Sequence, residues 1–198
     1  MSIINCQLSM TLGITGGIGS GKSYVAKLLQ REFSIPVYDC DTEAKRLTAT
    51  DEDIRLKLIE LVGSEVFEDG KLNRKCLADY LFADPEHASK VNSIIHPAVL
   101  KDFRRWAEEQ EAGTVALESA ILFESGFNAF VDKVLFVDAP EDVRLHRAML
   151  RDTATEAQIK ARMKMQQPEL HRLQADFIID NSTANDTRLL AQLAKALP

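Results

Sequence analysis

The sequence contains few of the residues on which disulfide-stabilised and zinc-stabilised proteins depend. It has 3 cysteines in 198 residues, and Cys6, Cys40 and Cys76 are odd in number and widely spaced. Such a pattern implies neither a disulfide framework nor a zinc site. The 4 histidines show no metal-ligand spacing either, so we interpret them as structural or surface residues.

Excess positive charge and long apolar runs are also missing. The formal net charge is -6 at pH 7, whereas a face that binds nucleic acid needs an excess of Lys and Arg. No apolar run approaches the length of a membrane span, and no Lys or Arg precedes Lys22, so the basic start of a signal peptide is absent. We therefore expect a cytoplasmic protein, a monomer or a weak homo-oligomer, with no nucleic acid and no membrane as partner.

Glycine, by contrast, is concentrated in one stretch near the N-terminus. Residues 16–23 read Gly-Gly-Ile-Gly-Ser-Gly-Lys-Ser and match the phosphate-binding loop G-x-x-x-x-G-K-[ST]. A buried strand over 10–15 is predicted before the loop and an amphipathic helix over 23–33 after it. The alternative is a flexible linker, but linkers do not stand between such elements. We expect nucleotide contacts from Gly17, Ile18, Gly19, Ser20, Gly21, Lys22, Ser23 and the adjoining Tyr24.

The residue types of this loop suit a nucleoside triphosphate bound with Mg²⁺. Glycines let consecutive backbone N–H groups point at a phosphate without a Cβ clash. The helix that follows directs its positive dipole end at the same phosphates. Lys22 is expected to bind the β and γ phosphates, and the Ser23 hydroxyl is the expected Mg²⁺ ligand.

A second predicted strand, over 35–39, ends in two carboxylates, Asp39 and Asp41. In an open parallel sheet the ligand site lies at the carboxyl ends of the strands, so both acids are expected at the edge that holds the phosphate loop. We expect one of them to position an attacking hydroxyl and the other to help hold water on Mg²⁺. The alternative is that one of them caps the helix that begins near Thr42.

Residues 42–113 have a helical pattern without a convincing strand, with a turn at Asp69-Gly70 and a kink or new helix expected at His96-Pro97. This segment is much longer than a simple crossover between strands. We therefore interpret it as a helical insertion that lies over the strand ends and binds the second substrate. The alternative is that its helices only pack against a face of the sheet.

Three further strands complete a predicted five-stranded parallel sheet. They cover residues 114–123, 134–137 and 176–180. Glu124 follows the first of them and Asp138 follows the second, and either is a candidate metal ligand. Asn181 follows the last strand, where it either contacts the base of the nucleotide or forms a turn.

Basic residues gather in residues 141–173 of a chain that is otherwise acidic. Arg147 and Arg151 are four residues apart and so lie on one face of a helix. The segment from Thr153 to Glu156 has the pattern of a capping box and predicts a break between two helices. A mobile helical pair with arginines is what a kinase lid needs, because fixed cations stabilise the transferring phosphoryl group. The alternative is a solvated surface helix.

The sequence lacks the motifs of two other classes of phosphate-loop protein. It contains neither the Asn-Lys-x-Asp and Asp-x-x-Gly sequences of GTPases nor the Leu-Ser-Gly-Gly signature of transport ATPases. What remains is a compact phosphotransferase, with residues 1–198 as one α/β domain of the three-layer P-loop NTPase type. Its acceptor is expected to be a small alcohol or a phosphate.

Several motifs together resemble the dephospho-CoA kinase family, in the family's order, from about residue 10 to about residue 185. They are the loop segment 12–23, Asp39-Cys40-Asp41, Ile95-His96-Pro97, Leu122-Phe123-Glu124, Arg147 with Arg151, Arg162 with Gln166, and residues 175–181. The resemblance implies ATP-dependent phosphorylation of the ribose 3′-hydroxyl of dephospho-CoA. This reaction gives coenzyme A and ADP and is the last step of coenzyme A biosynthesis.

The resemblance also implies roles for single residues. Asp41 would be the catalytic base, Lys22, Arg147 and Arg151 would hold the phosphates of ATP, and the insertion would face dephospho-CoA. The residues expected to contact the acceptor are Asp39, Asp41, His96 and Glu124. Two alternatives stay open: another small-molecule nucleoside or nucleotide kinase, and an ATP-binding regulatory protein that transfers nothing.

The sequence departs from the family's pattern at four positions. Tyr24 stands where threonine is usual and Lys45 where arginine is typical, while Glu118 and Ala120 replace an aspartate and a proline. Lys45 keeps the positive charge but lacks the bidentate fork of arginine. None of these departures affects Asp41 or the lysine and serine that end the loop.

Overall fold

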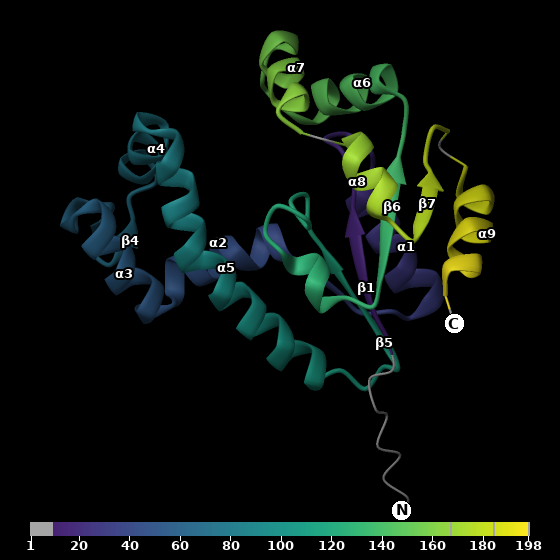
Figure 1. The fold of residues 1–198 in the computed structure, drawn as a ribbon, viewed down its shortest axis with the longest axis horizontal. Helices are drawn as coiled ribbons and strands as arrows, with labels where there is room; N and C mark the ends of the chain where they lie inside the picture. Colours follow the sequence, from purple (N-terminus) through teal and green to yellow (C-terminus); the bar gives the residue numbers. More distant parts are fainter. Residues whose placement is uncertain (1–9, 167, 184, 198) are drawn as a thin grey trace, which may run out of the picture. The chain divides into compact units, whose positions relative to one another are not determined.

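The computed structural model describes residues 10–166, 168–183 and 185–197 (Figure 1). The chain forms two compact units, one made of the residues up to Tyr38 and from Gln110 onward, the other of Asp39–Glu109. Cys40 and Cys76 are reduced thiols, and Cys6 lies outside the described residues. Among the described residues, no helix combines the length and the apolar composition that crossing a membrane requires.

The first unit is built on a parallel sheet with the strand order β2-β5-β1-β6-β7. The strands are β1 (Met10–Thr15), β2 (Val37–Asp39), β5 (Thr114–Glu118), β6 (Lys133–Asp138) and β7 (Phe177–Asp180). Gly13 in β1 is paired with Leu117 of β5 on one side and Val134 of β6 on the other. The predicted five-stranded parallel sheet is therefore confirmed, with β1 at its centre.

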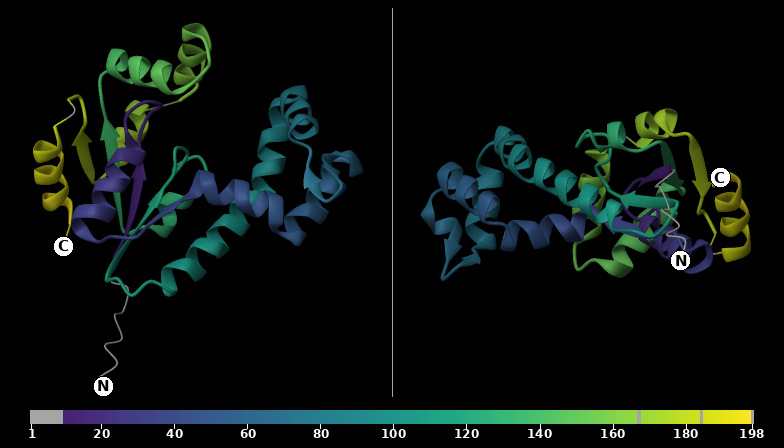
Figure 2. Two further views of the ribbon diagram at one scale, coloured as in Figure 1. Left: turned by 180° about the vertical axis from the view of Figure 1, so that it is seen from behind. Right: turned by 90° about the horizontal axis from the view of Figure 1, so that it is seen from below.

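Helices and turns cover both faces of this sheet (Figure 2). The helical elements of this unit are α1 (Lys22–Phe33), the 3-10 helix η2 (Phe127–Phe130), α6 (Glu141–Arg151), α7 (Glu156–Lys164), α8 (Pro168–Gln174) and α9 (Asp186–Ala196), of which α6 and α7 lie beyond the carboxyl end of β6 and not on a face of the sheet (Figure 1). Leu12 and Ile14 of β1 share a buried cluster with residues of α1 and α9. Gly13 points to the opposite face, where an added Cβ would lie 2.9 Å from the side chain of Leu122. The sheet is thus the middle of three layers, as predicted.

Strand β5 is shorter than we predicted. We expected it over residues 114–123, but it ends at Glu118 and the chain then forms turns up to Gly126. The Ser119 hydroxyl accepts the backbone N–H of Ile121 at 3.2 Å, and such a bond favours a turn over a continuing strand. Leu122 is 0% exposed, so the apolar run is buried by packing on the face of the sheet. The acid that ends this strand is therefore Glu118, and not a residue after 123.

The break between α6 and α7 exists, but its capping box lies two residues later than predicted. We expected the box from Thr153 to Glu156, whereas the cap of α7 is Thr155. The Thr155 hydroxyl accepts the N–H of Gln158 at 3.4 Å, and Gln158 Oε1 accepts the N–H of Thr155 at 2.9 Å. Glu156 instead forms an ion pair of 2.7 Å with Lys160, one turn further along the helix.

The second unit is mainly helical. Its elements are α2 (Cys40–Thr50), α3 (Glu52–Val62), the 3-10 helix η1 (Ser64–Val66), β3 (Phe67–Glu68), β4 (Lys71–Leu72), α4 (Arg74–Ala83) and α5 (Pro85–Glu108). We expected no strand here, but β3 and β4 form a short antiparallel pair. Asp69 and Gly70, with φ of 48° and 75°, make the tight turn between them. Helix α5 continues through Pro97 and does not start anew there.

Leu135 lies in the core of the sheet unit, so we predict that truncating it lowers stability strongly. Its side chain is 0% exposed in β6. Leu135→Ala should lower the free energy of unfolding by about 2–5 kcal/mol, because apolar burial is lost and a cavity is left. Equilibrium unfolding in urea measures this change. Leu150→Ala, at a position that is 76% exposed, is the control and should change it by less than about 0.5 kcal/mol. Equal losses of stability in the two variants would contradict the burial of Leu135 in the core.

Candidate active site

The phosphate loop is a sharply turning segment between β1 and α1. Gly19 and Gly21 have φ of 77° and 94°, in the left-handed region that residues with a Cβ rarely adopt. Helix α1 begins at Lys22, so its unpaired N–H groups belong to the loop. The Lys22 ammonium donates to the carbonyls of Gly16 at 2.9 Å and Gly17 at 3.2 Å. The cation is thus held on the loop by the loop's own backbone.

Asn181, which follows β7, supports the loop. Its side chain is 3% exposed, and its Nδ2 donates to the carbonyl of Ser20 at 2.7 Å. A Cβ on Gly21 would lie 2.2 Å from the same nitrogen, so this contact requires glycine at that position. Arg147 of α6 donates to the Asn181 carbonyl at 2.9 Å. The structure brings Asn181 and Arg147 together with the loop, while the contact of Asn181 with a base stays a prediction.

Two further contacts reach the loop region from distant parts of the chain. Gln166, just after α7, accepts the backbone N–H of Ile18 through Oε1 at 2.8 Å. The Tyr24 hydroxyl donates to the carboxylate of Asp186, and this hydrogen bond raises the pKa of Tyr24 above its ordinary value. Only the family resemblance pointed to Gln166, because nothing local in the sequence connects it to the loop.

Ser23 lies beside Glu118, a carboxylate that was not among the predicted metal ligands. Its hydroxyl donates to Oε1 of Glu118 at 2.8 Å, and Glu118 is 8% exposed at the end of β5. A hydroxyl and a carboxylate are hard oxygen donors, the type that Mg²⁺ prefers. One or two protein ligands suffice for Mg²⁺, which usually keeps several waters and binds substrate phosphates. The pair therefore fits the ion, although no cluster of three His, Cys, Asp or Glu in the described residues could hold a metal.

The two carboxylates that the sequence offered for the metal lie against basic residues of α8. Oε1 of Glu124 is 3.6 Å from Nε2 of His171. Nε of Arg172 donates to Oδ2 of Asp138 at 3.1 Å. In these contacts the partners of the two carboxylates are therefore residues of α8 and not Ser23. The contact of Glu124 with the acceptor stays a prediction.

The exposed arginines at the junction of α6 and α7 are already hydrogen-bonded to one carboxylate. Arg151 donates to the two oxygens of Asp152 at 2.8 Å and 3.3 Å, and Arg162 donates to Asp152 at 2.9 Å. These bonds, that of Arg151 foremost, lower the pKa of Asp152 to about 2. The Arg151 side chain is still 65% exposed. It can therefore exchange the carboxylate for phosphate, an acceptor of similar geometry.

In the second unit, Asp39 and Asp41 have different surroundings. Asp39 caps α2, because its carboxylate accepts the N–H of Thr42 at 3.0 Å and the Thr42 hydroxyl at 2.7 Å. The capping alternative is thus correct for Asp39. Asp41 lies in the first turn of α2, is exposed, and lines a cavity of about 770 Å³.

The cavity beside Asp41 has the size and the lining of a site for an organic ligand. Its lining residues are Asp41, Ala44, Lys45, Thr48, Ala49, Gly70, Lys71, Leu72, Arg74, Leu77, Leu81, Val91, Asn92 and Ile95. Its volume falls in the range of about 300–1,000 Å³ that is typical of ligand pockets. Three cations and several aliphatic side chains surround a single acid. We call this space the Asp41 cavity.

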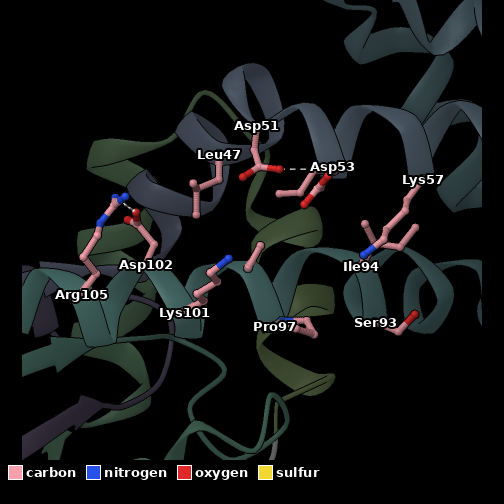
Figure 3. Close-up of a pocket in the computed structure, with 12 residues that line it drawn as sticks. Leu47, Asp51, Asp53, Lys57, Ser93, Ile94, Pro97, Lys101, Asp102 and Arg105 are labelled. Atoms are coloured by element: carbon pink, nitrogen blue, oxygen red, sulfur yellow. Dashed lines mark hydrogen bonds and ion pairs between the residues drawn. The ribbon is translucent and has the colours of Figure 1, made fainter.

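A smaller cavity of about 370 Å³ lies between the α2–α3 region and α5 (Figure 3). Asp102, on its wall, accepts from Arg46 at 2.6 Å and from Arg105. None of the predicted site residues lines this cavity. His96 on α5 lines neither cavity, and burial lowers its pKa below the ordinary 6.5, so its imidazole is neutral at pH 7.

Comparison with known proteins gives consistent matches. A family model described as dephospho-CoA kinase matches residues 10–186. The dephospho-CoA kinase of Bacteroides fragilis strain YCH46 is 48% identical over 176 residues, which cover 88% of this chain and 85% of the relative. That of Porphyromonas gingivalis is 46% identical over 175 residues, with 87% and 86% covered. The crystal structure of TT1252 from Thermus thermophilus is similar with a TM-score of 0.82 and 34% identity, over 96% of each chain.

The burial of His96 predicts a pH dependence of stability. Because its pKa is lowered on folding, the unfolded chain takes up a proton there at higher pH than the folded chain does. Stability should therefore fall as the pH drops through 6.5 and below. Urea midpoints at about pH 7.5 and pH 5.5 measure this change. His96→Asn, which cannot titrate, should lose less stability than the wild type, and equal losses would contradict the burial of the imidazole.

Proposed function

This chain belongs to the dephospho-CoA kinase family, and we infer that it transfers the γ-phosphoryl group of ATP to the ribose 3′-hydroxyl of dephospho-CoA. The products are coenzyme A and ADP, so the reaction is the last step of coenzyme A biosynthesis. The observation that carries this conclusion is the family match over residues 10–186, a range that contains the phosphate loop, Asp41 and the 141–173 segment.

The donor half of the site is the phosphate loop. We propose that residues 17–24 bind the polyphosphate of ATP through backbone N–H groups and the ammonium of Lys22. In the structure that ammonium donates to two carbonyls of the loop, at 2.9 Å and 3.2 Å. A phosphate oxygen is a stronger, charged acceptor and would draw it away. Asn181 supports the loop, and its contact with adenine is part of the proposal.

We propose that Ser23 and Glu118 together hold Mg²⁺. The ion, when bound, neutralises charge on the β and γ phosphates. The hydrogen bond of 2.8 Å between the two side chains brings one hydroxyl and one carboxylate to the same point beside the loop. Phosphate-loop NTPases in general use the loop Ser or Thr with a carboxylate from a neighbouring strand in this way. Glu118 ends such a strand and accepts from Ser23, whereas Glu124 lies beside His171 and Asp138 accepts from Arg172, which supports the role of Glu118 over theirs.

The acceptor half is assigned to residues 42–113, and within them to the Asp41 cavity. Dephospho-CoA combines a diphosphate with a long, weakly polar arm. The cations Lys45, Lys71 and Arg74 suit the diphosphate, and the aliphatic lining of the cavity suits the weakly polar arm. We propose that Asp39 and His96 act in the same half of the site, Asp39 by fixing the first turn of α2 and His96 as a neutral imidazole.

Asp41 is the proposed catalytic base. It follows the carboxyl end of β2 by two residues, and the carboxyl ends of parallel strands form the edge where α/β proteins bind ligands. An exposed carboxylate is a weak base, but the transition state of phosphoryl transfer is loose. Asp41 therefore needs mainly to orient the 3′-hydroxyl and to accept its proton late. Arg147 and Arg151 are proposed to stabilise the charge on the transferring group after exchanging their present partners.

We propose that residues 141–173 form the lid of the kinase. The cytoplasmic location and the absence of nucleic-acid and membrane partners are expectations from composition, and the monomeric or weakly oligomeric state is a separate expectation.

The experiment that tests the function is ADP release from ATP and Mg²⁺ with different acceptors. Dephospho-CoA should stimulate ADP release, and nucleosides or nucleoside monophosphates should not. Stimulation by a nucleoside alone would support the alternative of a nucleoside kinase. ATP binding without acceptor-dependent ADP release would support the alternative of a regulatory protein.

Asp41→Asn should abolish turnover and leave the affinity for ATP within a few fold. The amide keeps the size of the side chain but cannot accept the proton of the hydroxyl. Acceptor-dependent ADP release and calorimetric titration with ATP measure the two quantities. Asp79→Asn, an exposed position on α4 of the same unit, is the matched control and should keep wild-type turnover. Wild-type turnover in Asp41→Asn would remove Asp41 from the mechanism.

Glu118→Gln should raise the Mg²⁺ concentration needed for half-maximal activity by roughly 10–100-fold, because the ion loses a charged partner. The amide can still accept the hydrogen bond of Ser23, so the shape of the site is kept. A Mg²⁺ titration of ADP release at saturating ATP measures this. Glu111→Gln, at an exposed position before β5, should leave the titration unchanged. An unchanged titration in Glu118→Gln would refute the metal assignment.

A further inference from the structure

Arg144 of α6 lies against the phosphate loop, and the proposed phosphoryl transfer does not involve it. Its Nε donates to the carbonyl of Ala139 at 3.0 Å. One of its terminal nitrogens is buried and has no hydrogen-bond partner among the residues that the structure describes. A buried guanidinium N–H without a partner is costly, so a bound group that accepts from it or balances its charge would offset this cost.

The backbone of the loop is shaped around Arg144. A Cβ on Gly17 would lie 2.3 Å from the partnerless terminal nitrogen, and a Cβ on Gly19 would lie 2.1 Å from the backbone carbonyl of Arg144. Both positions therefore need glycine for a reason beyond backbone conformation. The loop and Arg144 pack directly on each other from Gly17 to Gly19.

Arg144 also differs from the other arginines of this region in its charge environment. Arg151 and Arg162 pair with Asp152, and Arg172 pairs with Asp138. Among the described residues, no carboxylate forms an ion pair with Arg144. Its positive charge is thus half-buried beside the phosphate loop without a counter-charge from the protein residues described.

A purely structural role does not explain this choice of residue. An aliphatic side chain of similar length would fill the space behind Gly17 without the cost of removing a charge from water. An arginine becomes favourable there only if an anion balances it. The established chemistry of the loop supplies such an anion, the polyphosphate of a nucleotide.

We propose that Arg144 is a positioning residue for the donor nucleotide. It supports the loop behind Gly17 and Gly19, and the polyphosphate on the other side of the backbone is its counter-charge. The inference rests on the proposed function and adds to it a determinant of donor affinity. Because Arg144 acts through the loop and through its charge, its effect grows with the number of phosphates on the nucleotide.

Calorimetric titrations of AMP, ADP and ATP into the wild type, Arg144→Met and Arg144→Lys test the proposal. Arg144→Met should weaken ATP binding by about tenfold, ADP binding by less, and AMP binding by less than about twofold. Arg144→Lys keeps the charge and should restore most of the ATP affinity. Arg31→Met, an exposed arginine in the last turn of α1, removes the same charge elsewhere and should leave all three affinities unchanged.

In steady-state assays the KM for ATP should rise in Arg144→Met while the KM for dephospho-CoA stays the same. Equal losses for AMP, ADP and ATP would show a merely structural role and would overturn the proposal, as would an ATP affinity equal to that of Arg31→Met. If Arg144→Met does not fold, Arg144→Gln gives the same comparison. A wild type that binds ATP but does not phosphorylate dephospho-CoA would overturn the proposed function and leave the role of Arg144 intact.

Discussion

A glycine-rich segment must aim several backbone N–H groups at one point, and it cannot hold that shape by itself. The structure meets this constraint with support from outside the loop. Asn181 binds the Ser20 carbonyl, Gln166 binds the Ile18 N–H, and Arg144 packs behind Gly17. The supporting residues all come from the last third of the chain, after β6. The parallel sheet is what brings the start and the end of the chain to one edge.

The other groups proposed to take part in the reaction also follow the carboxyl ends of strands of this sheet. Strand β1 runs into the loop, β5 ends in Glu118 next to Ser23, and β2 leads into the first turn of α2, where Asp41 lies. Each strand therefore leads to one type of group: N–H donors with a cation after β1, the carboxylate proposed to bind Mg²⁺ at the end of β5, and the carboxylate proposed for the acceptor after β2. The chain is acidic overall, with a formal net charge of -6, so its local cations matter for binding a polyanion. The Asp41 cavity, which is proposed to take the acceptor, is lined by residues of the second unit.

Much of the fold could be predicted from the sequence, because its main signals are local. The strand, loop and helix over residues 10–33 appear as predicted, since glycine spacing and apolar periodicity act within a few residues. The predicted end of β5 was wrong. Leu122 is buried because it packs on the face of the sheet, and apolar periodicity does not distinguish a residue buried in this way from one buried within a strand. The contacts that Glu118, Gln166 and Arg144 make with the phosphate loop were not predicted, for a different reason. The Ile18–Gln166 and Ser20–Asn181 contacts join residues 148 and 161 positions apart, and no spacing rule reports such a contact.

The central claim is that the loop binds the donor while Asp41 activates the acceptor hydroxyl. A crystal structure with a non-hydrolysable ATP analogue, Mg²⁺ and dephospho-CoA tests it most directly, through the distance between the Asp41 carboxylate and the ribose 3′-oxygen. We predict a distance of about 2.6–3.2 Å, with the γ-phosphorus of the analogue in line with that oxygen. A closed complex in which another residue contacts the 3′-oxygen and Asp41 does not reach it would contradict the claim.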